Sequence, residues 1–418
     1  MRSLLIATLL LLSVFCYADY LRAYKNTSLR KNAKSGSEKV IGGELHAGDL
    51  LEMLNDGQQT NGYYKTRIQG TSIEGWIYRS LVKRISGDLP TFMTDFEGVE
   101  VTIVDVGAGL GSIIKTPSGK YIIYDGGNGN HVHTFLKSIY DLGSDVQMII
   151  GSHTDSDHWG AIKEIARDYS VKQALITSYR PDGLPATVSD GIAELNKQEG
   201  IQFRDLASKA IAPGTLIYQE DGFGLRFISG FGQRDDVFAK ELGTNASKLR
   251  NAASIVIRLE YQDRAILFTG DAVGLEECKK SDCDCDYDCI STEKFMLDSA
   301  SQFLESDVII ASHHGARNAS CPDFIEAVNP DYVIFPSGNK HKHPHHITAM
   351  NYQSFGGVPA SNIFRTDVGS IPSDTDSNEC NNEWVGSNAG QTSSDGSFDD
   401  HIRIQISNRD RLIVGYLN

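Results

Sequence analysis

The sequence predicts an α+β protein with two folded parts, a small all-β barrel followed by a larger mixed domain. Three observations favour this division. Residues 19–86 hold short alternating strands with Gly-Asp and Asp-Gly turns, a pattern typical of small barrels. Across residues 95–418, longer apolar strands end abruptly in polar loops, as they do where sheets combine with helices. The length of 418 residues also exceeds that of a usual single domain.

Residues 1–18 predict a secretory signal peptide that is cleaved after Ala18. Arg2 precedes an apolar run from Leu4 to Leu12, and small residues follow near the cleavage point. The run is too short to remain in a bilayer as a span. Phe15 stands where a lipid anchor at Cys16 would require a small residue. We therefore expect a secreted protein, extracellular or periplasmic, without a transmembrane anchor.

The barrel segment, residues 19–86, carries eleven basic and seven acidic residues, a net charge of about +4. Its strands, and above all the sequence Gly-Trp-Ile-Tyr at 75–78, resemble a bacterial SH3-type domain. The resemblance implies a module that binds a cell-wall polymer. The alternative is a spacer barrel that binds no ligand.

The larger domain has an unusual cluster of polar residues directly after the apolar strand 146–150. The loop that follows carries His153, Asp155, Asp157 and His158. Alternate side chains of an extended segment share one face, so several of these groups can point the same way. Imidazole nitrogens and carboxylate oxygens are the ligands that zinc accepts. A helix N-cap would need only one such residue, so the cluster predicts a metal site.

Two further strands end in residues of the same kind. The strand at 265–269 is followed by Asp271, and the strand at 306–311 is followed by His313 and His314. Side chains at the ends of neighbouring strands converge on one edge of an α/β sheet. We expect all three loops to build one site.

The order of these segments resembles the metallo-β-lactamase superfamily, and most closely its ComEC-like branch, whose hydrolase domain is attached to a DNA-uptake channel. The resemblance covers residues 98–418 and implies a four-layer αββα sandwich with the site at one edge. The matching segments are Val104–Ile114, Tyr124–Gly127, His313–Gly315, Gly338-Asn339, His343-Pro344 and Arg365–Gly369.

The resemblance also implies two metal ions, expected to be Zn²⁺, with Mn²⁺ or another divalent ion as the alternative. The ligands would be His153 and Asp155 for the first ion, Asp157, His158 and His314 for the second, and Asp271 as a bridge. The loop with His153, Asp155, Asp157 and His158, here called the signature loop, resembles the superfamily's His-x-His-x-Asp-His signature, with Asp155 in place of the second His. Most of the superfamily adds a further histidine between this signature and the bridging Asp, but none occurs from Trp159 to Ser312. Water, an amide or a later histidine must complete the first position, which implies weaker occupancy or a different ion.

Three residues outside this ligand set are candidates for other roles. By resemblance, His313 would lie beside the substrate as a catalytic residue, together with Asp271. Asp125 would orient the signature loop. His343 would lie near the site or supply the missing ligand, whereas its neighbours His341, His345 and His346 are expected in a solvated loop.

Six cysteines remain beyond the signal peptide, an even number in an exported chain, which favours disulfides. A zinc knot is the alternative, but the Cys-x-x-Cys spacing typical of such sites does not occur. The six are Cys278, Cys283, Cys285, Cys289, Cys321 and Cys380.

The chain beyond residue 86 carries a net charge of about −20, which repels polyanions at long range. Nucleic acid is therefore a disfavoured partner, since nucleic-acid proteins usually present a basic surface. We predict an exported, dinuclear zinc hydrolase that acts on phosphodiester-type substrates through a metal-bridging hydroxide. The alternatives are a lactone or β-lactam hydrolase with the same site, and a non-catalytic cell-wall-binding protein with a degenerate site.

Overall fold

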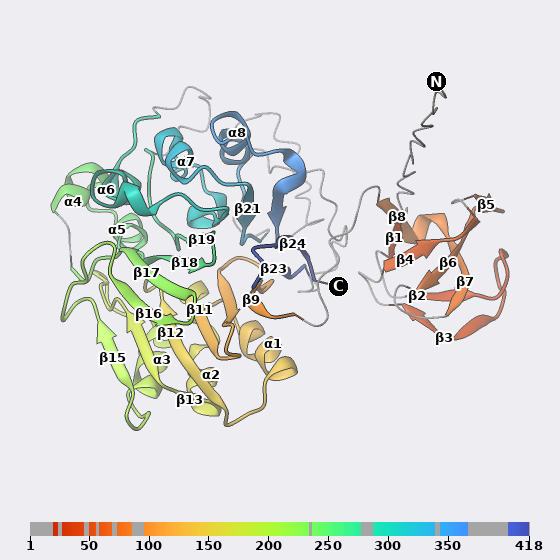
Figure 1. The fold of residues 1–418 in the computed structure, drawn as a ribbon, viewed down its shortest axis with the longest axis horizontal. Coiled ribbons are helices and arrows are strands. Elements are labelled where there is room, and N and C mark those ends of the chain that lie inside the picture. Colours follow the sequence, from red (N-terminus) through yellow and green to blue (C-terminus); the bar gives the residue numbers. More distant parts are fainter. Residues whose placement is uncertain are drawn as a thin grey trace, which may run out of the picture. The chain divides into compact units, whose positions relative to one another are not determined.

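The computed structural model describes residues 20–23, 27–45, 50–55, 58–68, 73–85, 96–233, 236–276, 287–338, 343–366 and 400–417. The chain divides into two compact units, Met1–Leu89 and Pro90–Asn418 (Figure 1). The predicted signal peptide lies outside the described residues. Among the helices in the described ranges, none has the length and apolar character needed to cross a membrane.

The first unit is all-β, as predicted. Its strands pair only in antiparallel fashion and enclose a small core that includes Leu21, Leu29, Leu51 and Ile77. They follow the order β3-β2-β7-β6-β4-β1-β8, with β5 paired to β6. The strands are β1 Tyr20–Ala23, β2 Thr27–Arg30, β3 Lys39–Leu45, β4 Leu50–Met53, β5 Gln59–Thr60, β6 Tyr63–Ile68, β7 Glu74–Tyr78 and β8 Val82–Ile85. The SH3-type assignment stays a prediction.

The second unit begins with a nine-stranded sheet, here called the first sheet. Its order is β15-β14-β12-β11-β10-β9-β23-β24, with β13 also paired to β12. The strands are β9 Gly98–Ile103, β10 Gly111–Lys115, β11 Tyr121–Gly126, β12 Asp145–Gly151, β13 Ser170–Val171, β14 Gln173–Ile176, β15 Gln202–Asp205, β23 Ile402–Ser407 and β24 Leu412–Tyr416. Every residue of β11 is buried, because the sheet is covered on both faces.

The second sheet has seven strands in the order β16-β17-β18-β19-β20-β21-β22. Strands β19 to β22 run parallel to one another. The strands are β16 Leu216–Glu220, β17 Phe223–Ser229, β18 Val256–Tyr261, β19 Arg264–Phe268, β20 Val308–Ile310, β21 Tyr332–Phe335 and β22 Ile363–Arg365. The two inner faces pack on each other through one large cluster, which includes Val101, Ile150, Ile257 and Phe268.

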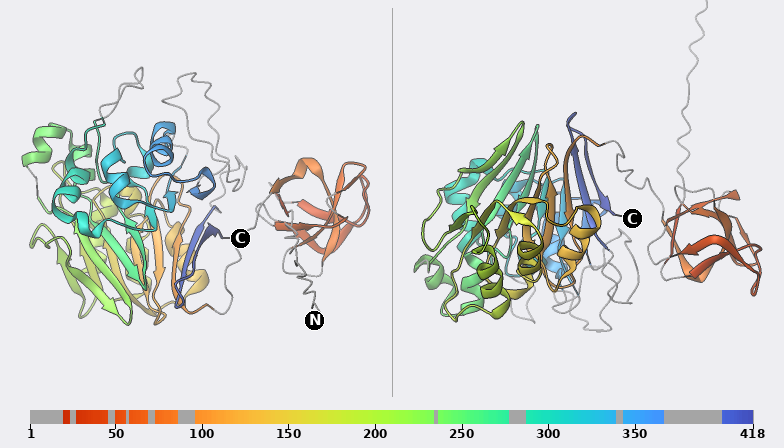
Figure 2. Two further views of the ribbon diagram at one scale, coloured as in Figure 1. Left: turned by 45° about the horizontal axis from the view of Figure 1, so that its top comes forward. Right: turned by 90° about the horizontal axis from the view of Figure 1, so that it is seen from below.

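Helices cover both outer faces of this pair of sheets (Figures 1 and 2). Helices α1 His131–Ile139, α2 Ile162–Asp168 and α3 Ala186–Leu195 pack on the first sheet. Helices α6 Ser291–Ala300, α7 Pro322–Val328 and α8 His346–Ser354 pack on the second. Two shorter helices, α4 Asp236–Leu242 and α5 Ala246–Ala252, form their own apolar cluster. The predicted αββα architecture is confirmed.

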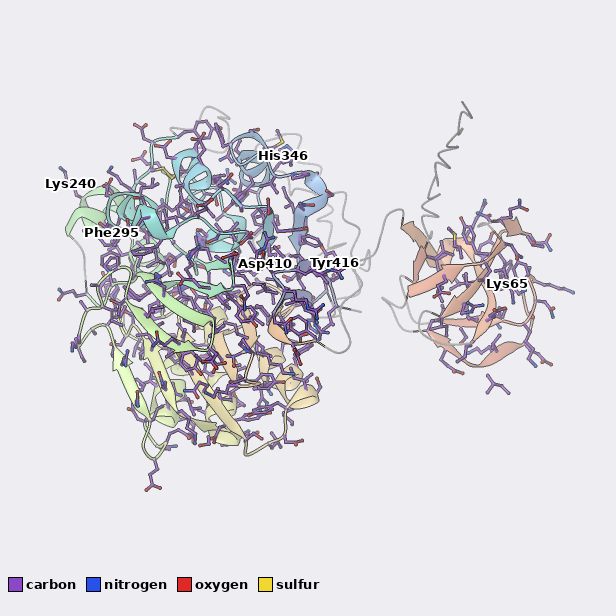
Figure 3. All side chains as sticks on the ribbon, in the orientation of Figure 1. Lys65, Lys240, Phe295, His346, Asp410 and Tyr416 are labelled. Carbon is purple, nitrogen blue, oxygen red and sulfur yellow. A yellow bond between two sulfur atoms is a disulfide. The ribbon has the colours of Figure 1, made fainter. Side chains whose placement is uncertain are left out.

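The last strand joins the two sheets at one side. The hydroxyl of Tyr416 on β24 accepts the N–H of Arg365 at 3.3 Å and is 3.1 Å from the Arg365 carbonyl. Tyr416 is labelled in Figure 3, and its ring also lies 5.5 Å from the ring of Phe364 on β22. Strand β24 of the first sheet therefore contacts the edge strand of the second.

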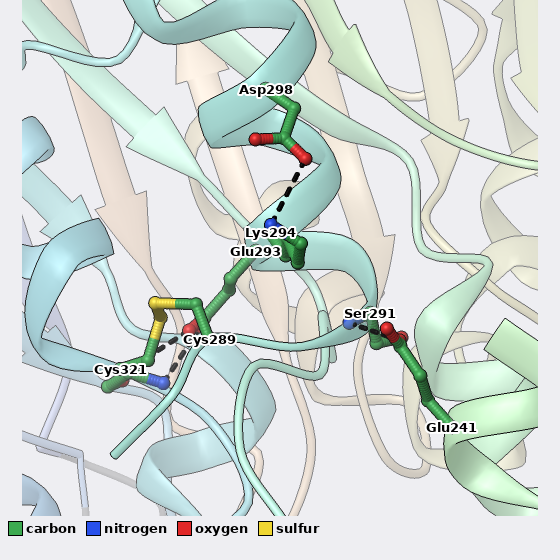
Figure 4. Close-up of a disulfide and its surroundings, with 8 residues drawn as sticks. Glu241, Cys289, Ser291, Glu293, Lys294, Asp298 and Cys321 are labelled. Atoms are coloured by element: carbon green, nitrogen blue, oxygen red, sulfur yellow. Dashed lines mark hydrogen bonds and ion pairs between the residues drawn. A yellow bond between two sulfur atoms is a disulfide. The ribbon is translucent and has the colours of Figure 1, made fainter. Parts of the chain in front are cut away.

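A disulfide supports the loops at one end of the second sheet. Cys289, just before α6, is bonded to Cys321, just before α7, which supports the disulfide prediction for this pair. Cys278, Cys283, Cys285 and Cys380 lie outside the described residues. Glu293 of α6 lies beside the disulfide, and its carboxylate accepts the N–H groups of Ser320 and Cys321, each at 2.8 Å (Figure 4). The disulfide and this carboxylate fix the same segment.

The buried carboxyl of Glu293 gives a prediction for stability against pH. Burial raises its pKa to about 7, well above the ordinary value of 4.5. Between pH 4.5 and 7 the folded state therefore keeps a proton that the unfolded state has lost. The contribution of the protonated Glu293 carboxyl to stability is complete below pH 4.5 and is lost as pH rises through 7. The Glu293→Gln variant should lose less stability than the wild type between pH 5 and pH 8, by up to about 3 kcal/mol.

The measurement is the free energy of unfolding from denaturant titrations at both pH values, in EDTA so that metal binding does not contribute. Asp298→Asn is the matched control, since it changes an exposed carboxylate of the same helix that pairs with Lys294. Parallel pH profiles for the wild type and Glu293→Gln would contradict the prediction.

Candidate metal centre

Three loops from both sheets meet at one edge of the sandwich. The signature loop follows β12 and contains the 3₁₀ helix Ser156–His158. In the second sheet, β19 and β20 are parallel neighbours with Phe268 paired to Ile310. The residues that follow these strands, Asp271 and the 3₁₀ turn Ser312–Gly315, therefore emerge side by side.

The carboxylate of Asp271 lies at the centre of this edge and is 3% exposed. Its Oδ1 lies 3.2 Å from Nε2 of His158 and 3.4 Å from Nε2 of His314. Its Oδ2 lies 3.7 Å from Nε2 of His153 and 3.7 Å from Nε2 of His313. Four imidazoles from two separate loops thus surround one carboxylate, as the sequence predicted for a shared site.

Two groups of side chains have the spacing of metal ligands. One group is His153, His158 and Asp271, and the other is Asp157, His158 and His314. Buried Nε2 of His153 and Oδ1 of Asp271 have no hydrogen-bond partner within the described ranges. Unpaired buried groups of this kind are costly unless a ligand satisfies them. The donor set of imidazoles and carboxylates therefore fits a divalent ion.

Asp125 orients the signature loop through hydrogen bonds from the neighbouring strand β11. Strand β11 runs parallel to β12, which places Asp125 beside the end of that strand. Its Oδ1 accepts the N–H of Ser152 at 2.7 Å, and its Oδ2 accepts the Ser152 hydroxyl at 2.6 Å and lies 2.8 Å from Nδ1 of His158. The proton of His158 is thereby held on Nδ1, which leaves Nε2 free to face the centre.

A backbone carbonyl orients His314 in the same way. Nδ1 of His314 lies 2.8 Å from the carbonyl oxygen of Pro336, so its Nε2 also faces the centre. His313 and His314 have φ angles of 48° and 56°, in the left-handed region that residues other than glycine rarely adopt. Such conformations cost about 1–3 kcal/mol each and concentrate at functional sites.

The electrostatics of the site favour positive charge on His158 and His314. Burial opposes protonation of His158, yet Asp271 and Asp125 outweigh it and raise its pKa. Burial likewise opposes the charged form of His314, but Asp271 raises the pKa of that ring as well. Burial disfavours ionisation of Asp271, and the surrounding imidazoles, His314 first, lower its pKa regardless. A bound cation would compete with protons for these groups, so metal affinity should fall at acid pH.

The other predicted residues lie around this centre. Asp157 Oδ2 lies 4.0 Å from Nε2 of His314. Asp155 is in neither group. Its Oδ2 lies 3.7 Å from Nε2 of His153, and its Oδ1 accepts from Arg250 Nε at 2.6 Å and Arg180 Nη1 at 3.0 Å. The ring of His343 lies 5.7 Å from that of His313, which places it at the margin of the site.

The histidines near His343 differ in their surroundings. His345 is 8% exposed, and burial lowers its pKa to about 3. The expectation of a solvated loop is therefore wrong for His345, because it lies at the start of α8 and packs in the structure. His346 is half-buried on that helix, and His341 lies outside the described residues.

Sequence patterns did not reveal four residues that hold the site. Asn318 Oδ1 lies 2.8 Å from Nδ1 of His313, and Asn251 lies 3.1 Å from its Nε2. Arg180 and Arg250 bind Asp155. One available signal was that Arg180 follows β14, the parallel neighbour of β12, because residues after adjacent parallel strands share an edge.

Residues 104–338 match the family model described as "Metallo-beta-lactamase superfamily". The matched segment is more than half of the chain. This protein belongs to the metallo-β-lactamase superfamily. Membership implies a site for divalent metal, and it agrees with the donor set described above.

Two curated proteins are related to the chain at low identity, and both support the ComEC-like branch. "Competence protein ComA" of Neisseria gonorrhoeae is 22% identical over 274 residues, which are 64% of this chain and 31% of that protein. "ComE operon protein 3" of Bacillus subtilis (strain 168) is 23% identical over 267 residues, which are 59% and 29% of the two chains. This metallo-β-lactamase chain thus spans less than a third of the length of each of these two relatives.

Several solved structures are similar to this chain at low identity. A metallo beta lactamase from Hirschia baltica has 16% identity and a TM-score of 0.32, and the match covers 58% of this chain and 97% of that one. Zn(2+)-bound PqqB from Methylobacterium extorquens has 7% identity and a TM-score of 0.36, with 64% and 97% covered.

The hydrogen bond between Asp125 and His158 gives a prediction for metal affinity. Asp125→Asn should weaken binding of Zn²⁺ about 10–100-fold, because the amide orients the His158 ring less well and makes it less basic. Competition of the bound metal against a chromophoric chelator measures this change.

Asp168→Asn is the matched control, since Asp168 accepts from His133 at 3.0 Å near the start of β12, at the opposite end of that strand from the site. Equal metal affinity of Asp125→Asn and the wild type would show that Asp125 does not support the ligands.

Proposed function

We propose that this chain is an exported metal-dependent hydrolase that cleaves phosphodiester-type substrates, with Zn²⁺ as the ion. The observation that carries the proposal is the carboxylate of Asp271 between the imidazoles of His153, His158, His313 and His314. The family supports metal-dependent hydrolysis, and the relation to the ComEC-like branch favours phosphodiesters over lactones and β-lactams.

The residues present would hold up to two ions. Asp157, His158 and His314 would hold one ion and His153 would hold the other, with Asp271 close to the histidines of both groups. When bound, zinc acts as a Lewis acid and lowers the pKa of water to near neutrality.

His313 is the group best placed to move a proton. Its side chain is 22% exposed, whereas that of His314 is 6% exposed. Burial lowers the pKa of His313. Nδ1 is fixed by Asn318, and Nε2 faces Asp271 at 3.7 Å. A proton given or taken at Nε2 would serve general acid–base catalysis.

Two single-residue variants should separate metal binding from proton transfer if this proposal holds. Asp271→Ala should abolish turnover and release metal, because it removes the anion that faces both positions. His313→Ala should keep the metal and lower the rate about 10²–10⁴-fold, the usual contribution of an acid–base group. Metal content is measured by elemental analysis, and rates are measured in parallel.

The substrate screen uses metal-loaded protein on bis-nitrophenyl phosphate, a phosphorylcholine ester, DNA, a lactone and nitrocefin. Hydrolysis of the first two and its loss in Asp271→Ala support the proposal. Opening of the lactone or nitrocefin alone would assign the runner-up activity. A protein that retains no metal and hydrolyses nothing would be a binding protein with a degenerate site.

We further propose that residues 19–86 are a targeting domain and residues 95–418 the hydrolase. The support is the charge of about +4 on the first segment against about −20 on the rest. An anionic cell-wall polymer would attract the first unit and repel the second, which directs the enzyme to the wall.

A sedimentation assay with isolated cell walls tests this targeting role. Residues 19–86 and the mature chain should sediment with the walls, whereas residues 95–418 should remain in solution. Binding should weaken with added salt, because screening at about 0.15 M limits the attraction to roughly 8 Å. Sedimentation of residues 95–418 alone would make the first unit a spacer.

A further inference from the structure

Two guanidinium groups occupy the side of the site where the first metal ion is expected. Arg250 lies at the end of α5 and Arg180 follows β14, and their side chains are only 10% and 14% exposed. Arg250 Nε and Arg180 Nη1 both donate to Oδ1 of Asp155, at 2.6 Å and 3.0 Å. Arg180 also donates to the carbonyl of Thr154. Both groups are therefore buried beside the site.

The second oxygen of Asp155 has a donor as well. The Asn251 amide satisfies all its neighbours when Nδ2 donates to Asp155 Oδ2 at 3.3 Å and to Ser247 O at 3.1 Å, and its oxygen accepts from His313 Nε2. Both oxygens of Asp155 thus face donors from α5 and Arg180, and Oδ2 also lies 3.7 Å from Nε2 of His153. With Asp155 engaged in this way and His158 shared with the second position, His153 and Asp271 remain as the first position's own ligands, whereas zinc sites of enzymes usually have three protein ligands.

The two arginines also bind a second, more accessible carboxylate. Arg250 Nη1 lies 3.1 Å and 3.0 Å from the two oxygens of Asp182, and Arg180 Nε lies 3.2 Å from Oδ1. The Asp182 side chain is 45% exposed, in contrast to the two guanidinium groups. Arginine side chains favour carboxylate and phosphate oxygens as partners. Asp182 therefore holds a place that an anionic oxygen of another molecule can take.

We propose that Arg180 and Arg250 replace the first metal ion as the positive group that binds a phosphate oxygen of the substrate, in exchange for Asp182. The resting protein then holds one ion tightly, at Asp157, His158, Asp271 and His314. The inference rests on the proposed function for the class of substrate, and it narrows the number of tightly bound ions from two to one.

The first test counts metal ions and needs no substrate. After loading with excess Zn²⁺ and desalting, elemental analysis should find about one ion per wild-type chain. The double variant Asp155→His/Arg250→Met should retain about two, because it adds an imidazole ligand and removes a competing cation. Retention of two ions by the wild type, or of one by the double variant with native circular dichroism, would overturn the metal count.

The second test measures binding of inorganic phosphate to the zinc-loaded protein by calorimetry. Arg250→Met and Arg180→Met should each weaken binding about 10–100-fold, the effect of losing one charge-assisted hydrogen-bond donor group. Arg250→Lys keeps the charge but not the planar donor pair, and it replaces Arg250→Met if that variant does not fold. Arg264→Met is the control, since Arg264 pairs with Asp307 at the opposite end of β19.

Asp182→Asn separates an anion subsite from a structural ion-pair network. Removal of the internal carboxylate should strengthen phosphate binding several-fold if the substrate competes with Asp182, whereas a structural role predicts no gain. Weaker or unchanged binding in Asp182→Asn overturns the subsite. Failure of the hydrolysis screen together with these phosphate results would reject the proposed activity and leave the subsite standing.

Discussion

The buried carboxylate of Asp271 is the group on which the arrangement of the site depends. A single negative charge lies 3.2–3.7 Å from four imidazoles that come from both sheets of the sandwich. The rings would repel one another if protonated together, and the carboxylate would be costly to bury alone. A divalent ion resolves both problems. Protonation, metal content and the close approach of the two sheet edges are therefore linked in this protein.

The loops that carry the imidazoles are held by contacts outside the site. On one side, Asp125 fixes the signature loop through Ser152 and His158. On the other, Glu293 and the disulfide Cys289–Cys321 anchor the segment just after the strained histidine pair. Such external support is what allows two consecutive histidines to keep left-handed backbone angles at a site. Rigid surroundings of this kind keep ligands in place before an ion binds.

The fold and the gathering of the central histidines and carboxylates could be predicted from the sequence, because both depend on patterns of residues that are close together along the chain. The strands are short runs of apolar residues, and the polar residues of the site come soon after them in the sequence, as for His158, Asp271 and His314. The support from α5 is not local. Arg250 meets Asp155 across 95 positions of the chain and Arg180 meets it across 25, and only the placement of α5 against the signature loop brings them together. The burial of His345 depends on packing in the same way.

The exchange of a histidine for Asp155 in the signature changes charge as well as coordination. An imidazole there would add a neutral ligand to a cation, whereas a carboxylate adds a negative charge and calls for positive partners. Arg180 and Arg250 supply them, and Asp182 balances the remaining charge. These two positive and two negative side chains make a network with no net formal charge. It follows that residue 155 cannot be considered apart from α5. A histidine restored at 155 alone would leave Arg250 buried without Asp155, a costly arrangement, which is why restoring the ligand also requires removal of the arginine.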